Sequence, residues 1–282
     1  MYISDLESSV AMDSHILHRN NVKIIGNGSQ PMLLAHGFGC DQNMWRYITP
    51  AFEDTYRLIL FDYVGSGQSE KTAYDPQRYS NLKGYAQDIL DICQALDLTN
   101  VIFVGHSVSS IIGILAAIEQ PQRFEQLILI GPSPRYLNEK PDYIGGFEPE
   151  DIDELLGLMD QNYIRWANAL APLIMGRPDA PEFGQELTQS FCSTDAIVMK
   201  QFARVTLLSD NRADLAKLEV PTLILQCDQD IIAPRPVGEY MHQHLANNTL
   251  WYMKATGHCP HLSAPTETIA LMQAYLSTSQ LV

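Results

Sequence analysis

The segment Gly105-His106-Ser107-Val108-Ser109 has the form of a nucleophile elbow, the sharp turn that exposes a catalytic serine. It follows the apolar run 101–104 and precedes an apolar helical pattern that Pro121 ends, which is the strand, turn and helix context that an elbow needs. Gly105 is small enough for the turn to close, whereas Ser109 stands where glycine is usual. The alternative is an ordinary connection between a strand and a helix. We therefore take Ser107 as the candidate nucleophile.

A serine hydroxyl needs a base to take its proton and an acid to orient that base, in the chain order Ser, Asp, His for this kind of elbow. Asp230 lies just beyond the apolar run 222–225, where carboxyl ends of parallel strands place functional groups. Asp228 competes with it. We favour Asp230 because the apolar segment 231–234 that follows should bury and fix its carboxylate.

The candidate base is a histidine in the segment 256–261. His258 follows Gly257, which allows the close approach that a catalytic loop requires. His261 competes with it, but we expect His261 to begin the next helix, and its simplest role is that of a structural hydrogen-bond donor. The predicted triad is thus Ser107, Asp230 and His258.

The segment His36-Gly37-Phe38-Gly39 follows the apolar run 32–35, where an oxyanion hole would need a backbone N–H group. We assign the two donors to Phe38 and to Val108, the residue after the nucleophile, because preorganised N–H groups stabilise charge on a carbonyl oxygen. The alternative is a simple turn. We interpret the glycine-containing turn 62–69 as scaffold.

The elements that must position these residues alternate along the chain. Periodic apolar positions predict helices over 82–96, from 108 to Pro121 and over 266–276. Continuous apolar runs, typical of buried parallel strands, occur at 32–35, 58–61, 101–104, 127–130, 222–225 and 250–253. The alternation indicates an α/β fold with a mostly parallel sheet flanked by helices.

The pattern changes over residues 142–209, where no strand signal occurs and amphipathic helices are predicted. We expect these helices to be broken by Pro172, Pro178 and Pro181. Because strands of one sheet precede and follow this segment, we interpret it as a helical lid inserted in a single domain. The core then comprises residues 15–141 and 210–282, after an N-terminal extension over residues 1–14.

Three aromatic side chains, Phe147, Trp166 and Phe202, are spread over the predicted lid. They could form the core of the insertion. A lid must also cover the serine and exclude water, so some of them could face the pocket instead.

The composition limits the possible partners. A chain of 282 residues with 46% hydrophobic residues can bury a large core, which excludes a disordered protein. A net charge of −15 without a basic cluster argues against nucleic acid. No apolar run reaches the roughly 20 residues that span a bilayer, and the first residues do not resemble a signal peptide. Five cysteines without a CxxC pair indicate reduced thiols in a cytoplasm.

Other chemistries fail on spacing. Gly65 and Gly67 do not belong to a GxGxxG motif, so no dinucleotide site is predicted. His242 and His244 are two residues apart on a predicted helix, where their side chains point in different directions, which favours a solvated surface over a zinc site. We expect no metal and no cofactor.

The motifs together resemble those of the RsbQ-like α/β-hydrolase-fold stress regulators and, more distantly, of the plant karrikin and strigolactone receptors. The resemblance covers residues from about 15 to 276. The stretches that carry it are HGFGCDQNMW, LILFDYVGSGQSE, YAQDILDICQALDL, FVGHSVSSIIGILAAI, GPSPRYLN, YIGGFE, FCSTDAIV, ILQCDQDIIAP, YMHQHL and GHCPHLS.

This resemblance implies an α/β-hydrolase fold with the triad and oxyanion hole assigned above, and a four-helix lid over an apolar pocket. It implies that Phe147, Trp166 and Phe202 match lid or pocket aromatics. It also implies a sensor that handles a small hydrophobic compound and activates a phosphatase carrying a PAS domain in the general stress (sigma-B) pathway. A metabolic carboxylesterase or lactonase has the same triad and stays an alternative. A binding module with a vestigial triad is disfavoured because all three residues are present.

Overall fold

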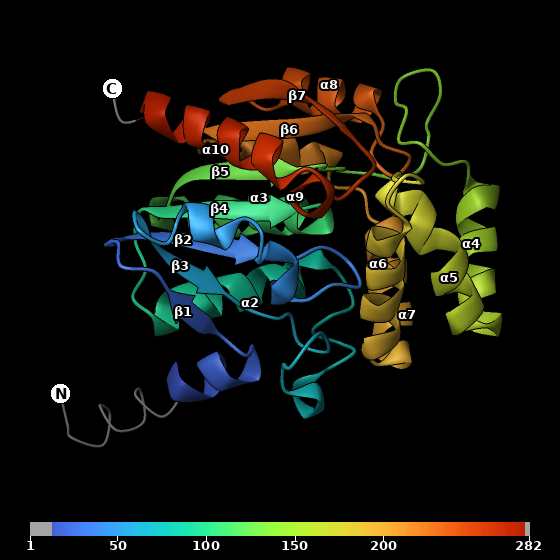
Figure 1. Ribbon diagram of the computed structural model, residues 1–282, viewed down its shortest axis with the longest axis horizontal. Helices are drawn as coiled ribbons and strands as arrows, with labels where there is room; N and C mark the ends of the chain where they lie inside the picture. Colours follow the sequence, from blue (N-terminus) through green and yellow to red (C-terminus); the bar gives the residue numbers. More distant parts are fainter. Residues whose placement is uncertain (1–12, 280–282) are drawn as a thin grey trace.

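A seven-stranded β-sheet forms the centre of the protein in the computed structural model, which describes residues 13–279 (Figure 1). The strand order is β1-β3-β2-β4-β5-β6-β7, and every neighbouring pair is parallel except β1 and β3. The strands are β1 Lys23–Ile25, β2 Gln30–Ala35, β3 Tyr56–Leu60, β4 Val101–His106, β5 Phe124–Ile130, β6 Thr222–Gln229 and β7 Asn248–Thr256.

All six predicted strands coincide with strands of this sheet, and the predicted mostly parallel sheet is confirmed. The seventh strand, β1, was not predicted. This strand has three residues, all of them exposed, so it lacks the apolar run that marks the buried strands.

Helices cover both faces of the sheet (Figure 1). The helices α2 (Leu82–Ala95), α3 (Val108–Glu119) and α8 (Arg235–His244) pack against the face that presents Leu33 and Ile59. The helices α9 (Pro260–Ser263) and α10 (Pro265–Ser279) cover the opposite face. Because successive strand residues point to opposite faces, central strands with a core on both sides must be apolar throughout.

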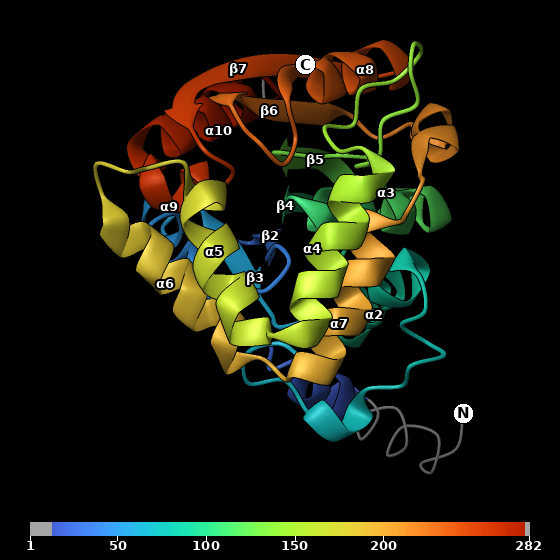
Figure 2. The same ribbon diagram turned by 90° about the vertical axis from the view of Figure 1, so that its right-hand side faces the viewer.

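Four helices between β5 and β6 stand over the carboxyl ends of the strands (Figure 2). They are α4 (Pro149–Gln161), α5 (Tyr163–Met175), α6 (Pro181–Ser193) and α7 (Ala196–Leu207), and all lie within the predicted lid, residues 142–209. Figure 2 shows α5 beside α6 and α4 beside α7, with a gap between the two pairs. The two ends of the insertion meet, because the Asn211 N–H donates to the Pro134 carbonyl (2.8 Å) and Arg135 pairs with Asp210.

One expectation about the lid is wrong. Pro172 does not break a helix: α5 continues through it to Met175. An internal proline removes one backbone hydrogen bond, and here its ring packs against Gly184 of α6. Pro181 instead is the first residue of α6. A backbone N–H at that position would have no acceptor inside the helix, so proline costs no hydrogen bond there.

The predicted N-terminal extension, residues 1–14, lies almost entirely outside the described residues. Within residues 13–279, no helix has the length and apolar character to cross a bilayer.

Candidate active site

Ser107 lies in a strained turn between β4 and α3. Its φ and ψ are +57° and −125°, a conformation that a residue with a side chain rarely adopts, so the surrounding structure must hold it in place. The Ser107 N–H donates to the Ile130 carbonyl of β5 (2.8 Å). A Cβ atom at Gly105 would lie 2.8 Å from the Ser109 carbonyl oxygen, so the turn requires glycine at position 105. This is the geometry of a nucleophile elbow.

Ser109, which replaces the usual glycine of the elbow, has a specific role. Its buried hydroxyl donates to the His36 carbonyl and lies 3.0 Å from the Tyr63 hydroxyl. The His36 ring adds a second anchor, because its Nε2 accepts the Tyr63 N–H (3.1 Å). The serine therefore ties the elbow to the segment 36–39, which holds the predicted oxyanion donor Phe38.

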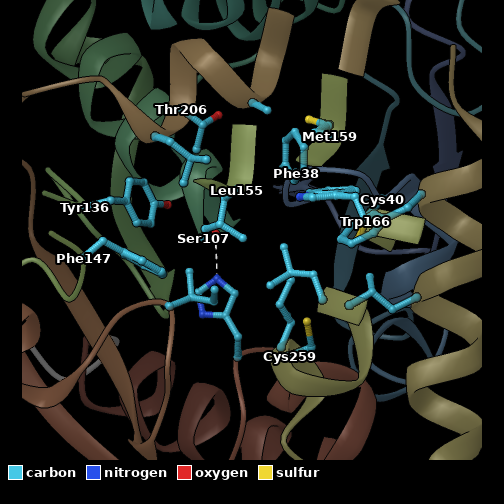
Figure 3. Close-up of a pocket in the computed structure, with 18 of the residues that line it drawn as sticks. Phe38, Cys40, Ser107, Tyr136, Phe147, Leu155, Met159, Trp166, Thr206 and Cys259 are labelled. Atoms are coloured by element: carbon cyan, nitrogen blue, oxygen red, sulfur yellow. Dashed lines mark hydrogen bonds between the residues drawn. The ribbon is translucent and has the colours of Figure 1, made fainter. Parts of the chain in front are cut away.

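The three predicted triad side chains form one chain of hydrogen bonds. Ser107 Oγ lies 2.7 Å from His258 Nε2, drawn as the dashed line in Figure 3, and His258 Nδ1 lies 2.7 Å from Asp230 Oδ2. No member is more than 5% exposed. In this geometry His258 can take a proton from Ser107 while Asp230 holds the ring in the required tautomer.

The competing aspartate is placed differently. Asp228 is exposed and pairs with Arg235 (3.0 Å). Asp230 Oδ1 accepts the N–H groups of Ile232 (2.8 Å) and Ala233 (3.0 Å). The segment 231–234 therefore fixes the carboxylate through its backbone N–H groups, and Asp230 is 5% exposed, although the Ile231 side chain itself is 52% exposed.

Hydrogen bonds also fix both the backbone N–H and the backbone carbonyl of His258. Its N–H donates to the carbonyl of Ile174 in α5 (2.8 Å), and its carbonyl lies 2.7 Å from His106 Nε2. The preceding Gly257 has a φ of +81° and packs so closely on the end of α5 that a Cβ there would lie 1.9 Å from the Met175 carbonyl oxygen. The last turn of a lid helix thus contacts the candidate catalytic loop through main-chain atoms.

Three buried side chains beside the triad could offer ligand atoms to a metal ion. His106, Cys259 and His261 bring one such atom each within 4.8 Å of one another. Burial lowers the pKa of both histidines, to about 3 for His261, so both rings are neutral. The ring nitrogens of His261 have no hydrogen-bond partner among residues 13–279, which contradicts the expected donor role, and the ring packs on Trp45.

Phe38 links the predicted oxyanion segment to the lid. Its ring contacts three lid aromatics, with centroid distances of 6.1 Å to Trp166, 5.8 Å to Phe191 and 5.6 Å to Phe202. Val108 is the first residue of α3, so its N–H has no acceptor inside the helix. The assignment of both N–H groups to an oxyanion hole stays a prediction.

An apolar pocket opens above Ser107 (Figure 3). Phe147 and Trp166 line it, as does Phe38. Phe202 does not line it, because its ring is packed between Phe38 and the Tyr85 ring of α2, 4.3 Å away. The lining residues with polar or sulfur atoms that had no role assigned from the sequence include Cys40, Tyr136, Thr206 and Cys259.

These four residues gave no usable signal in the sequence. Cys40, Tyr136 and Cys259 stand in stretches that carry the resemblance, but the sequence does not indicate what their side chains do, and Thr206 stands outside those stretches. Burial raises the pKa of the Cys40 thiol to about 12 and holds the pKa of the Cys259 thiol well above its usual value, so both thiols line the pocket uncharged. All five cysteines lie within the described residues and none is paired.

A serine elbow after a central parallel strand, with its aspartate and histidine after later strands, defines the α/β hydrolases. The chain belongs to the alpha/beta hydrolase fold family, whose sequence profile matches residues 30–265.

Its relatives include receptors and esterases. It is 39% identical over 267 residues to a strigolactone esterase of Arabidopsis thaliana, covering 94% of this chain and 99% of that protein. It is 38% identical over 258 residues to the Karrikin insensitive 2 receptor CA of Petunia hybrida, covering 91% and 95%. The solved structure of a hydrolase from Oleispira antarctica superposes with a TM-score of 0.92 at 46% identity, covering 94% and 97%.

The contact between Gly257 and α5 predicts a large effect of Gly257→Ala. The added Cβ would meet a backbone oxygen in a strained conformation, so we expect the free energy of unfolding in urea to fall by at least about 2 kcal/mol. Gly157→Ala in α4 is the matched control, because nothing lies within 4 Å of its Cβ. It should leave stability unchanged or raise it. Equal stabilities of the two variants would contradict this packing.

Burial of His261 predicts a pH-dependent stability. As pH falls from about 6.5 towards 3, the unfolded chain binds a proton at this residue that the folded chain excludes, so the free energy of unfolding drops by about 1.4 kcal/mol per pH unit. His261→Phe should therefore flatten the decline measured by urea unfolding between about pH 6.5 and pH 5. The exposed His242→Gln should leave the slope as it is. An unchanged slope in His261→Phe would refute the prediction.

Proposed function

We propose that this protein is a serine hydrolase that binds and slowly hydrolyses a small hydrophobic ester or lactone, and that it acts as a sensor. The observation that carries the proposal is the hydrogen-bonded chain from Ser107 through His258 to Asp230, which opens into an apolar pocket. Proximity of nucleophile, base and orienting acid is what acyl transfer at serine requires.

In the proposed reaction Ser107 Oγ attacks the carbonyl carbon while its proton passes to His258 Nε2. The carbonyl electron pair moves onto oxygen, where the N–H groups of Phe38 and Val108 stabilise the charge. When the carbonyl forms again, the bond to the alkoxy oxygen breaks and that oxygen takes the proton from His258. Water, deprotonated by His258, then attacks the acyl carbon, the bond from that carbon to Ser107 Oγ breaks, and Oγ takes the proton from His258 as the acid is released.

The lining of the pocket supports a small hydrophobic ligand. Its lid side presents apolar side chains of α4 and α5, among them Leu155, Met159 and Trp166. Apolar walls with a few polar groups select apolar molecules that carry a reactive polar centre. Relatives named as a strigolactone esterase and a karrikin receptor fit this substrate class.

The sensor role rests on the resemblance to RsbQ-like regulators and on one contact. Because the His258 N–H bonds to the Ile174 carbonyl of α5, a ligand or acyl group that shifts the histidine also shifts the end of a lid helix. The proposed partner is a cytoplasmic phosphatase with a PAS domain in the general stress pathway. Exposed Glu150, Asp153 and Glu154 on α4 give the lid an acidic surface for a basic partner patch.

The second candidate is a metabolic carboxylesterase or lactonase without a signalling partner. The similarity to the Oleispira antarctica structure, described as a hydrolase, favours it. The rate of turnover separates the two candidates, because a sensor gains from a long-lived bound state and a metabolic enzyme from rapid product release.

The triad assignment predicts that Ser107→Ala abolishes hydrolysis of p-nitrophenyl acetate. Loss of the nucleophile typically costs several orders of magnitude, to be measured as release of p-nitrophenol by purified protein. Ser110→Ala is the matched control, since this neighbouring hydroxyl only donates to the Gly105 carbonyl (2.9 Å). It should retain activity within about tenfold. Retention of full activity by Ser107→Ala would refute the assignment.

The sensor proposal predicts a slow enzyme with a partner. We expect kcat/KM on the best substrate to stay below about 10⁴ M⁻¹s⁻¹. A pull-down from native lysate should recover a phosphatase in a ligand-dependent way, and Asp153→Lys with Glu154→Lys should reduce its recovery. Rapid turnover with no partner recovered would instead establish the metabolic hydrolase.

A further inference from the structure

The hydroxyl of Tyr136 is a buried polar group without an assigned role. Tyr136 lies in the loop that follows β5, is 2% exposed and lines the pocket beside Ser107 (Figure 3). Its hydroxyl makes no hydrogen bond of ordinary geometry within the described residues. A buried donor left unpaired is destabilising, so its presence needs a reason.

The loop does not need this hydroxyl for its own structure. The Tyr136 carbonyl accepts the Phe147 N–H (3.1 Å), which is a main-chain bond. The second buried tyrosine of the loop, Tyr143, does use its hydroxyl as an anchor, donating to the Arg135 carbonyl (2.6 Å). Tyr143 therefore shows what a structural phenol looks like in this loop, and Tyr136 differs from it.

The Tyr136 hydroxyl is a hydrogen-bond donor at neutral pH. Burial raises the pKa of the phenol well above its usual value, and the nearby Ser107 hydroxyl lowers it only in part. The group thus keeps its proton, and the hydroxyl of the candidate nucleophile lies near it.

The position of Tyr136 indicates which substrate atom it meets. Figure 3 shows Tyr136 on one side of Ser107 and Phe38 on the other. With the carbonyl oxygen of a bound ester directed to the N–H groups of Phe38 and Val108, the other substituents of the reacting carbon extend away from Phe38. Of these substituents, only the alkoxy oxygen can accept a hydrogen bond from the Tyr136 hydroxyl. This oxygen gains negative charge as its bond to carbon breaks.

We propose that the Tyr136 hydroxyl donates a hydrogen bond to the alkoxy oxygen of the bound ester or lactone and so favours its departure. The inference rests on the proposed hydrolase function. The carbon–oxygen bond breaks, its electron pair stays on the alkoxy oxygen, and His258 supplies the proton that this oxygen takes. Tyr136 keeps its own proton throughout and is a further catalytic residue.

The dependence on the leaving group tests this role. An alkyl alkoxide needs stabilisation far more than p-nitrophenolate, whose charge is delocalised. Tyr136→Phe should therefore lower kcat/KM for an alkyl ester such as ethyl acetate by about 10- to 100-fold more than for p-nitrophenyl acetate, which has the same acyl group. The melting temperature of this variant should not fall, because the lost hydroxyl has no ordinary partner.

Tyr143→Phe is the matched control, since it removes a hydroxyl from the same loop but not from the pocket. It should change the rates for both esters by the same factor. An equal loss for both esters in Tyr136→Phe would overturn the proposal and leave the hydrolase function intact. If the unmodified protein hydrolysed neither ester, the proposed function itself would fail.

Discussion

The candidate active site depends on how His258 is held. Four hydrogen bonds fix this one residue: its ring bonds to Ser107 and Asp230, its N–H to Ile174 and its carbonyl to His106. These partners come from the elbow, the loop after β6 and a lid helix, which are far apart in the sequence. A triad requires its atoms to be placed within fractions of an ångström, and here that accuracy comes from the convergence of separate elements on a single histidine.

Apart from Asp230, the ionisable side chains packed beside this histidine are uncharged. Burial keeps His106 and His261 neutral, and the thiols of Cys40 and Cys259 protonated. In the proposed reaction, these neutral surroundings leave the Asp230 carboxylate and the charge that develops on the substrate as the main charges of the site. In a water-excluding pocket such charges interact strongly with fixed dipoles, which is the condition under which backbone N–H donors are effective.

Much of the fold was predictable because the sheet is buried on both faces, so its strands appear in the sequence as continuous apolar runs. The elbow could be predicted because its strain restricts the residues at 105–109. Other features could not be predicted. Nothing in the sequence indicates that the backbone of 231–234 would bind Asp230, that Pro172 would lie inside α5, or that Phe202 would pack away from the pocket. Each depends on contacts between distant segments, which neither periodicity nor spacing records.

The contact between the lid and His258 has a consequence for how this protein can diversify. The lid helix offers a main-chain carbonyl to His258, and glycine backbone packs on glycine backbone at Gly176 and Gly257. Substitutions elsewhere on α5 leave these atoms in place. The side chains of the lid that face the pocket can therefore change in evolution while the backbone contacts between α5 and the candidate catalytic loop stay the same. A family built in this way can evolve new pocket linings without having to rebuild the backbone contact between the lid and His258.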